Sequence, residues 1–134
     1  TLGNYLWDNS EELYLALTCR PLRGLFLQGS YVSASHGNEY DYVHKDISKI
    51  LAQPFMQDKV WSNKTIAFNA NYEIVNNVFA LLTVESSNIK GGNATGAKIP
   101  AEYRTDAQGY LDMYTPQFLQ GKNLTFTFGL KVGL

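Results

Sequence analysis

The segment NLTFTFGLKVGL, residues 123–134, alternates strictly between apolar side chains and side chains that are polar or small. Its apolar positions are Leu124, Phe126, Phe128, Leu130, Val132 and Leu134. A period of two places successive side chains on opposite faces of a β-strand, so one face of this strand is apolar throughout. A soluble edge strand of this kind invites aggregation, whereas a lipid-facing strand of an outer-membrane β-barrel requires such a face.

The same segment resembles the C-terminal strand that barrel proteins present to their assembly machinery. We therefore expect the barrel assembly machinery to be a partner of this chain. The expected assembly signal consists of Phe128, Gly129, Leu130, Val132 and Leu134. An aromatic residue usually ends such strands, and Leu134 takes that place here.

Four further segments carry the period-two pattern, near residues 12–20, 25–35, 64–74 and 78–86. The third is the most regular of them, and its apolar face consists of Ile66, Phe68, Ala70, Tyr72 and Ile74. Together with the terminal segment, these patterns predict five antiparallel strands.

Short and long connections alternate between these strands. PLRG at 21–24 and Asn76–Asn77 are tight-turn signals after the first and third strands. The segments at about 36–62 and 87–122 are long. Outer-membrane barrels have short periplasmic turns and long extracellular loops, so this parity places Leu134 on the periplasmic side.

The predicted fold is therefore all-β, an antiparallel up-and-down transmembrane β-barrel in the bacterial outer membrane. Residues 1–134 are expected to form a single barrel segment with about five C-terminal strands and two long extracellular loops. About eight strands are the practical minimum for closure. Further strands should therefore come from the same chain or from another one, and outer-membrane lipid is an expected partner.

Composition and motifs exclude several classes of function. The net charge of −1 gives no electrostatic basis for nucleic-acid binding. No run approaches the roughly 20 consecutive apolar residues of a membrane helix. The single cysteine, Cys19, cannot form an internal disulfide and is best explained as a small apolar filler. The chain holds no P-loop, dinucleotide fingerprint, HExxH or paired-cysteine motif, so we predict no catalytic residues, cofactor or metal.

The first long segment contains the groups that come nearest to a chemical site. They are His36, Glu39, Asp41, His44 and Asp46. Carboxylate and imidazole groups at this spacing could bind Ca²⁺, although a solvated loop explains them better. The spacing of apolar residues from Val43 to Leu51 predicts a short helix in the same segment, and the glycines of the second long segment predict a flexible loop.

Aromatic residues gather in the predicted outer segments. Flat rings beside amide and carboxylate groups commonly hold sugars, because the ring covers the apolar C–H face of the sugar and the polar groups bind its hydroxyls. The glycan-binding candidates are Trp61, Tyr40 and Tyr42, with Asn38 and Asp41 as polar neighbours. An interfacial girdle with loop packing explains Trp61 equally well.

Four segments together resemble the C-terminal end of the capsule assembly Wzi family as found in Bacteroidetes. They read GNYLWDNSEELYLAL, CRPLRGLFLQGSYVSASHGNEY, PFMQDKVWSNKTIAFNANYEIVNN and YTPQFLQGKNLTFTFGLKVGL. The resemblance implies a longer outer-membrane barrel that binds surface polysaccharide and helps the capsule attach to the cell. The family offers no catalytic residues to carry over to this chain.

Three functions follow from these observations. The first is a non-enzymatic outer-membrane protein that binds surface polysaccharide through its outer loops. The second is a pore, transport or secretion component, for which the polar lumen matters more than the loops. The third is a soluble β-barrel carrier of an apolar ligand, which the alternation of long and short connections disfavours.

Overall fold

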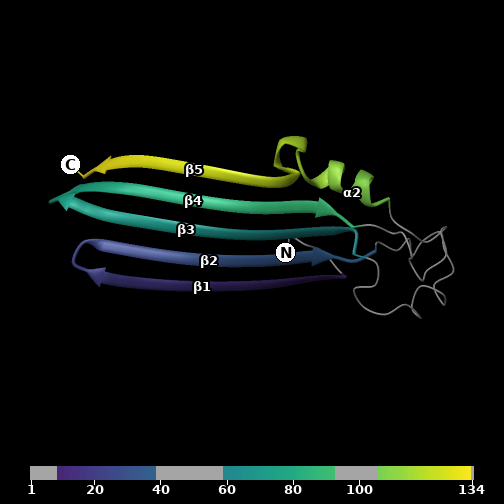
Figure 1. The fold of residues 1–134 in the computed structure, drawn as a ribbon, viewed down its shortest axis with the longest axis horizontal. Helices are drawn as coiled ribbons and strands as arrows, with labels where there is room; N and C mark the ends of the chain where they lie inside the picture. Colours follow the sequence, from purple (N-terminus) through teal and green to yellow (C-terminus); the bar gives the residue numbers. More distant parts are fainter. Residues whose placement is uncertain (1–8, 39–58, 93–105, 134) are drawn as a thin grey trace.

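Five long strands form one sheet in the computed structural model of the chain, which describes residues 9–38, 59–92 and 106–133. The strands are β1 (Ser10–Leu22), β2 (Leu25–His36), β3 (Trp61–Val75), β4 (Val78–Gly91) and β5 (Gly121–Val132). Their order in the sheet is β1-β2-β3-β4-β5, so each strand pairs with its neighbours in the sequence (Figure 1). Every pair is antiparallel, which confirms the predicted up-and-down arrangement.

The sheet is open, with β1 at one edge and β5 at the other. The described residues therefore form a curved sheet and not a closed barrel. Five strands are too few to bring the two edges together, because a barrel closes with about eight strands at the least. Each edge strand leaves one row of backbone N–H and C=O groups without a neighbouring strand.

The observed strands are longer than the predicted ones at the end opposite the short turns. β4 continues to Gly91, beyond the predicted end near Ser86. The added residues are mostly polar, but their backbone still pairs on both sides, since Asn88 lies opposite Lys64 of β3 and opposite Lys122 of β5. The apolar pattern thus marks only the middle of each strand, while backbone pairing sets its full length.

The two short connections are tight turns that use residues with positive φ. Gly24 has a φ of 81° between β1 and β2, and Asn77 has a φ of 64° between β3 and β4. Glycine and asparagine are the residues that adopt this conformation most readily, as the sequence predicted. We call this end of the sheet the turn end, and the opposite end, with His36, Trp61 and Gly91, the loop end.

One face of the sheet is apolar across all five strands. Phe68 lies opposite Gly29 of β2 and Val84 of β4, and Val84 lies opposite Phe126 of β5. The next row toward the turn end has the same character, with Cys19, Leu27, Ala70, Leu82 and Phe128. Many side chains of this face are exposed, such as Leu17 at 79% and Phe128 at 71%, while Leu27, Ala70 and Val84 are half-buried.

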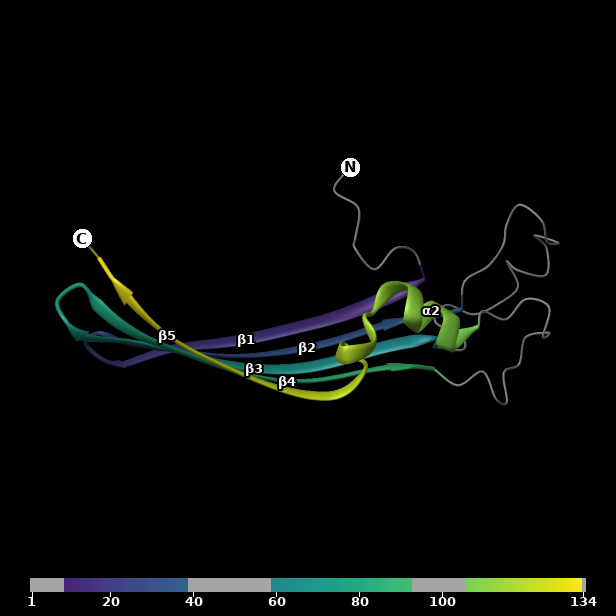
Figure 2. The same ribbon diagram turned by 90° about the horizontal axis from the view of Figure 1, so that it is seen from above.

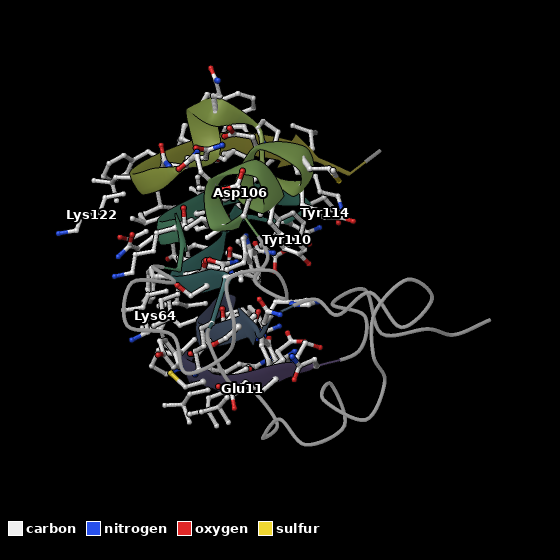
Figure 3. All side chains as sticks on the ribbon, turned by 90° about the vertical axis from the view of Figure 1, so that its right-hand side faces the viewer. Glu11, Lys64, Asp106, Tyr110, Tyr114 and Lys122 are labelled. Carbon is white, nitrogen blue, oxygen red and sulfur yellow. The ribbon has the colours of Figure 1, made fainter. Side chains whose placement is uncertain are left out.

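The opposite face is mostly less exposed and carries polar rows, together with the apolar residues Phe26, Phe79 and Leu81 toward the turn end. Gln28, Asn69, Thr83 and Thr127 form one row across β2 to β5, and the Thr83 hydroxyl donates to the Asn69 side-chain oxygen at 2.8 Å. Viewed along the strands, the sheet is an arc with Lys64 and Lys122 on its outer side and Tyr110 and Tyr114 on its inner side (Figure 3). The apolar face is therefore convex and the polar face concave.

The buried core lies at the loop end, where α2 (Ala107–Tyr114) covers the inner face (Figure 2). Its apolar members are Ala34, Val60 and Leu111, each at most 4% exposed. The 3₁₀ helix η2 (Gln117–Leu119) then leads into β5. No helix in the described ranges is both long enough and apolar enough to cross a membrane.

The helix α2 lies in the second long segment, beyond the glycines that predict a flexible loop, and it was not predicted from the sequence. Asp106 caps its start, because its side chain accepts from the Gln108 backbone N–H at 3.2 Å. Pro116 follows its end, where a proline prevents the helix from continuing. Gly109 obscured the pattern in the sequence. The helix predicted near residues 43–51 lies outside the described residues.

Candidate functional site at the loop end

Four ring-bearing residues meet on the inner face at the loop end, and we call them the mouth cluster. They are His36, Trp61, Tyr110 and Tyr114. The rings of His36 and Tyr110 have centroids 5.0 Å apart, and those of Tyr110 and Tyr114 are 4.6 Å apart. The indole N–H of Trp61 donates to the hydroxyl of Thr115 at 3.2 Å. The ends of β2 and β3, where His36 lies opposite Trp61, are therefore joined to α2 by ring contacts and a hydrogen bond.

Helix periodicity explains how α2 supplies its part of this cluster. Tyr110 and Tyr114 are four residues apart, so they share one side of the helix. Leu111 and Thr115 share the adjacent side and are buried against the sheet. Gly91 permits this close packing, because a Cβ at that position would lie 3.2 Å from the carbonyl oxygen of Ala107.

The members of the mouth cluster differ in accessibility. His36 is 2% exposed, and its Nδ1 lies 2.6 Å from the carbonyl oxygen of Gly37. A carbonyl oxygen can only accept, so Nδ1 carries the proton. Tyr114, by contrast, is 53% exposed, while Trp61 and Tyr110 are half-buried. Tyr114 is therefore the ring that a ligand from solvent reaches first.

A polar network on another side of α2 holds the helix to the corner before β5. Asp112 accepts from the side-chain amides of Gln108 at 2.8 Å and Gln120 at 2.9 Å. The Gln120 amide also donates to the carbonyl oxygen of Thr115 at 3.0 Å. These bonds fix the end of the helix and, through Thr115, the position of the Trp61 ring.

Backbone hydrogen bonds beyond the strand ends connect the segments at the loop end of the sheet. The Val60 N–H donates to His36 O at 2.9 Å, and the Gly92 N–H donates to Val60 O at 2.7 Å. A Cβ at Gly92 would overlap the carbonyl oxygen of Lys59, so only glycine fits there. Lys59 in turn forms an ion pair with Glu11 of β1 at 2.6 Å. These hydrogen bonds and the ion pair thus hold the strand ends together at the loop end of the sheet.

The predicted glycan-binding residues divide into three groups in the structure. Trp61 belongs to the mouth cluster. Asn38 is 1% exposed, and its backbone oxygen accepts from the Asn9 side chain at 2.8 Å. Tyr40, Asp41 and Tyr42 lie outside the described residues.

The proposed set lacked Tyr110 and Tyr114, although their spacing of four residues behind the capping residue Asp106 is a helix signal. The pattern alone did not show that this helix would lie against Trp61. That placement depends on packing between segments far apart in the sequence.

The predicted assembly signal lies on β5. Phe128, Leu130 and Val132 point from the convex face and are 71%, 65% and 61% exposed. Gly129 lies on the concave face, opposite Leu81. Leu134 is outside the described residues.

A second concavity occupies the inner face at the turn end. It has a volume of about 530 Å³, and its lining includes Arg20, Phe26, Asn71, Glu73 and Phe79. The Arg20 guanidinium lies 5.4 Å from the centre of the Phe26 ring, and the Asn71 side-chain oxygen is buried without a hydrogen-bond partner. This hollow therefore combines charged and amide side chains with the apolar side chains of Phe26 and Phe79.

Metal binding finds no support within residues 9–38, 59–92 and 106–133, where no three His, Cys, Asp or Glu side chains gather. Glu39, Asp41, His44 and Asp46 lie outside these ranges. The mouth cluster offers the ring faces of two tyrosines and a tryptophan, and such faces can stack on a ligand.

Comparison with known proteins gives no family for this chain: no family model matches it, and no curated protein or solved structure is significantly similar to it. The resemblance to the Wzi family therefore stays a prediction.

Proposed function

We propose that this chain is part of a non-enzymatic outer-membrane β-barrel whose loop end binds surface polysaccharide and aids capsule assembly or attachment. The observation that carries the proposal is the apolar convex face, which continues in register across all five strands. A soluble protein rarely exposes so large an apolar surface. Lipid is the solvent that suits it.

The dimensions of the apolar face support this assignment. On β3 the exposed apolar residues run from Ile66 to Val75, which corresponds to about 30 Å along an extended strand. Strands of outer-membrane barrels tilt by about 35–45°, so the span along the bilayer normal is roughly 23 Å. This value is close to the apolar band of about 25 Å in such barrels.

The free edges of β1 and β5 support the need for further strands. Unpaired backbone N–H and C=O groups cost several kcal/mol each in the hydrocarbon region. Strands from the same polypeptide or from another one would pair with both edges and close the barrel. The concave polar face, with Asn69 and Thr83, then becomes the wall of its lumen.

The polysaccharide part of the proposal rests on the mouth cluster. Tyr114 presents an exposed ring in contact with the ring of Tyr110, and the Trp61 indole is bonded to Thr115, the residue after Tyr114. Such rings can cover the apolar face of a sugar. The hydrogen bonds at the loop end hold this region in place, so it loses less conformational entropy on binding than a free loop would.

The test compares two exposed aromatic residues of the same connection. Tyr114→Ala should weaken binding of the purified protein to surface polysaccharide by about three- to tenfold, because an aromatic contact contributes about 0.5–1.5 kcal/mol. Phe118→Ala is the matched control, since Phe118 is 76% exposed in η2 and outside the mouth cluster. Heat-modifiable gel mobility verifies that both variants fold.

Alanine at Tyr40, Tyr42 and Trp61 extends the same experiment to the residues that the sequence indicated. Weaker binding in the Tyr40 or Tyr42 variant would place the glycan nearer to the first long connection, whereas weaker binding in the Trp61 variant would support the mouth cluster. Unchanged polysaccharide binding in Tyr114→Ala and in all three of these variants would count against the glycan proposal.

A pore is the second candidate, and the turn-end hollow favours it. A lumen lined by Arg20, Asn71 and Glu73 would conduct small solutes. Single-channel conductance of the complete barrel tests this function. A soluble carrier of an apolar ligand is less favoured, because the continuous apolar rows across all five strands lie on the exposed convex face.

A further inference from the structure

Three lysines border the apolar convex face at its loop end. They lie on three adjacent strands, Lys64 on β3, Lys90 on β4 and Lys122 on β5. Lys64 and Lys122 each lie opposite Asn88, and Lys90 follows two residues later on the same face. All three are exposed. Figure 3 shows Lys64 and Lys122 on the side of the sheet that faces away from Tyr110 and Tyr114.

No carboxylate neutralises this group among the described residues of the convex face on β2 to β5. Glu73 and Glu85 belong to the concave face, since each alternates with apolar outward neighbours. Glu11 of β1 does lie on the convex face, but it is paired with Lys59. The three lysines therefore form a positive rim above an uncharged apolar surface.

The positive charge is confined to one border of the apolar face. Toward the turn end the convex face ends in Ile74, Val78 and Val132, which carry no charge. The basic residues of that end are Arg20, Arg23 and Lys131; the first two line the inner hollow and the third lies on the concave face of β5. An anionic partner on the convex side is therefore attracted to the loop end only.

We propose that Lys64, Lys90 and Lys122 bind the phosphorylated headgroups of the lipids that surround the loop end of the barrel. This inference rests on the proposed membrane placement and names the lipid chemistry that the placement requires. Lysine stems can lie along apolar surface while their ammonium groups reach the headgroup layer. A ligand held by these groups would place its acyl chains against Ile66 and Leu124, the next residues of the same face.

The spacing suits phosphate groups of a lipid layer. Neighbouring strands are about 4.8 Å apart, so Lys64 and Lys122 stand roughly 10 Å apart across β4. Two flexible side chains at this separation can close on one phosphate or reach two neighbouring headgroups. A soluble anion would gain the same charges but no contact with the apolar rows below them.

The test uses the full chain and vesicles of two compositions, phosphatidylcholine alone and phosphatidylcholine with a minority of phosphatidic acid. Co-flotation measures the affinity of the protein for each. We expect tighter binding to the anionic vesicles. Each lysine near an anionic surface should contribute about fivefold, so Lys64→Gln, Lys90→Gln and Lys122→Gln together should remove on the order of a hundredfold.

Lys131 provides the matched control on the same strand as Lys122. Lys131→Gln removes the same charge from the concave face at the turn end, and it should leave the preference for anionic vesicles unchanged. Raising the salt concentration should weaken the preference of the unmodified protein. Inorganic phosphate at millimolar concentration should not displace the vesicles.

Each result has a distinct meaning. The inference is overturned if the triple variant keeps the full preference, if Lys131→Gln acts like Lys122→Gln, or if inorganic phosphate competes as a soluble ligand would. If the protein still enters neutral vesicles, any of these three outcomes counts against the headgroup site alone and not against the membrane placement. A protein that enters neither kind of vesicle overturns the membrane placement itself, and the headgroup site with it.

Discussion

The indole N–H of Trp61 and the hydroxyl of Thr115 form a hydrogen bond of 3.2 Å between residues 54 positions apart in the sequence. Trp61 is the first residue of β3, and Thr115 caps the end of α2. The bond therefore ties the helix to the inner face of the sheet.

Removing this bond should loosen α2 without changing the sheet. Thr115→Val keeps the volume of the side chain but leaves the Trp61 N–H without its partner, which should cost about 0.5–1.5 kcal/mol. Hydrogen exchange of the Thr115 amide, which donates to the Leu111 carbonyl at 2.8 Å, measures the loss. Thr125→Val, on the inner face of β5, is the control. Equal exchange rates in both variants would show that the bond does not hold the helix.

A charge on the convex face should disrupt the membrane-embedded state. Phe128→Arg should destabilise the inserted protein by about 2–4 kcal/mol if Phe128 lies near the bilayer midplane. Thr127→Arg introduces the same charge one residue away on the polar concave face and should be tolerated. Urea titration of protein inserted in vesicles measures both free energies of unfolding. Similar values for the two variants would contradict the assignment of the faces.

The last strand is predicted to act in assembly as well as in packing. Deleting Gly129–Leu134 should abolish insertion into the outer membrane, because it removes the outward residues Leu130 and Val132 from the proposed signal. The amount of folded protein at the cell surface is the measurement. Lys131→Gln keeps those outward residues and should insert normally. A truncated protein that reaches the surface at normal levels would argue against a targeting role.

Alanine should destabilise the protein at Gly24, in the turn between β1 and β2, but not at Gly29, in the middle of β2. Gly24 has a φ of 81°, and a Cβ there would lie 3.3 Å from the Cβ of Glu73. Gly24→Ala should therefore cost about 1–2 kcal/mol. Gly29 lies in an extended strand with open space around it, so Gly29→Ala should be neutral or slightly stabilising. Thermal or urea unfolding compares the two, and an equal loss in both would refute the explanation from backbone conformation.

Sequence alone determined the strands, their alternating faces and the two turns, because these depend on residues close together in the chain. The period of two in each strand shows that Ile66, Phe68 and Phe128 belong to an apolar face. Gly24 and Asn77 are recognisable as turn residues because they readily adopt positive φ. The same local rules indicated Trp61 as a site residue. They did not indicate that Asn38 is buried or that α2 brings Tyr110 and Tyr114 to the same place.

Tertiary structure decided what depends on register and curvature. Lys64 and Lys122 become neighbours of Asn88 only because β3, β4 and β5 pair in one register. The arc of the sheet makes the apolar face convex and exposed. Trp61 and Thr115 are 54 positions apart in the sequence and meet only because α2 packs on the end of β3. Local side-chain patterns contain no information on such pairings, because the free energy that selects them comes from contacts that exist only once the sheet has formed.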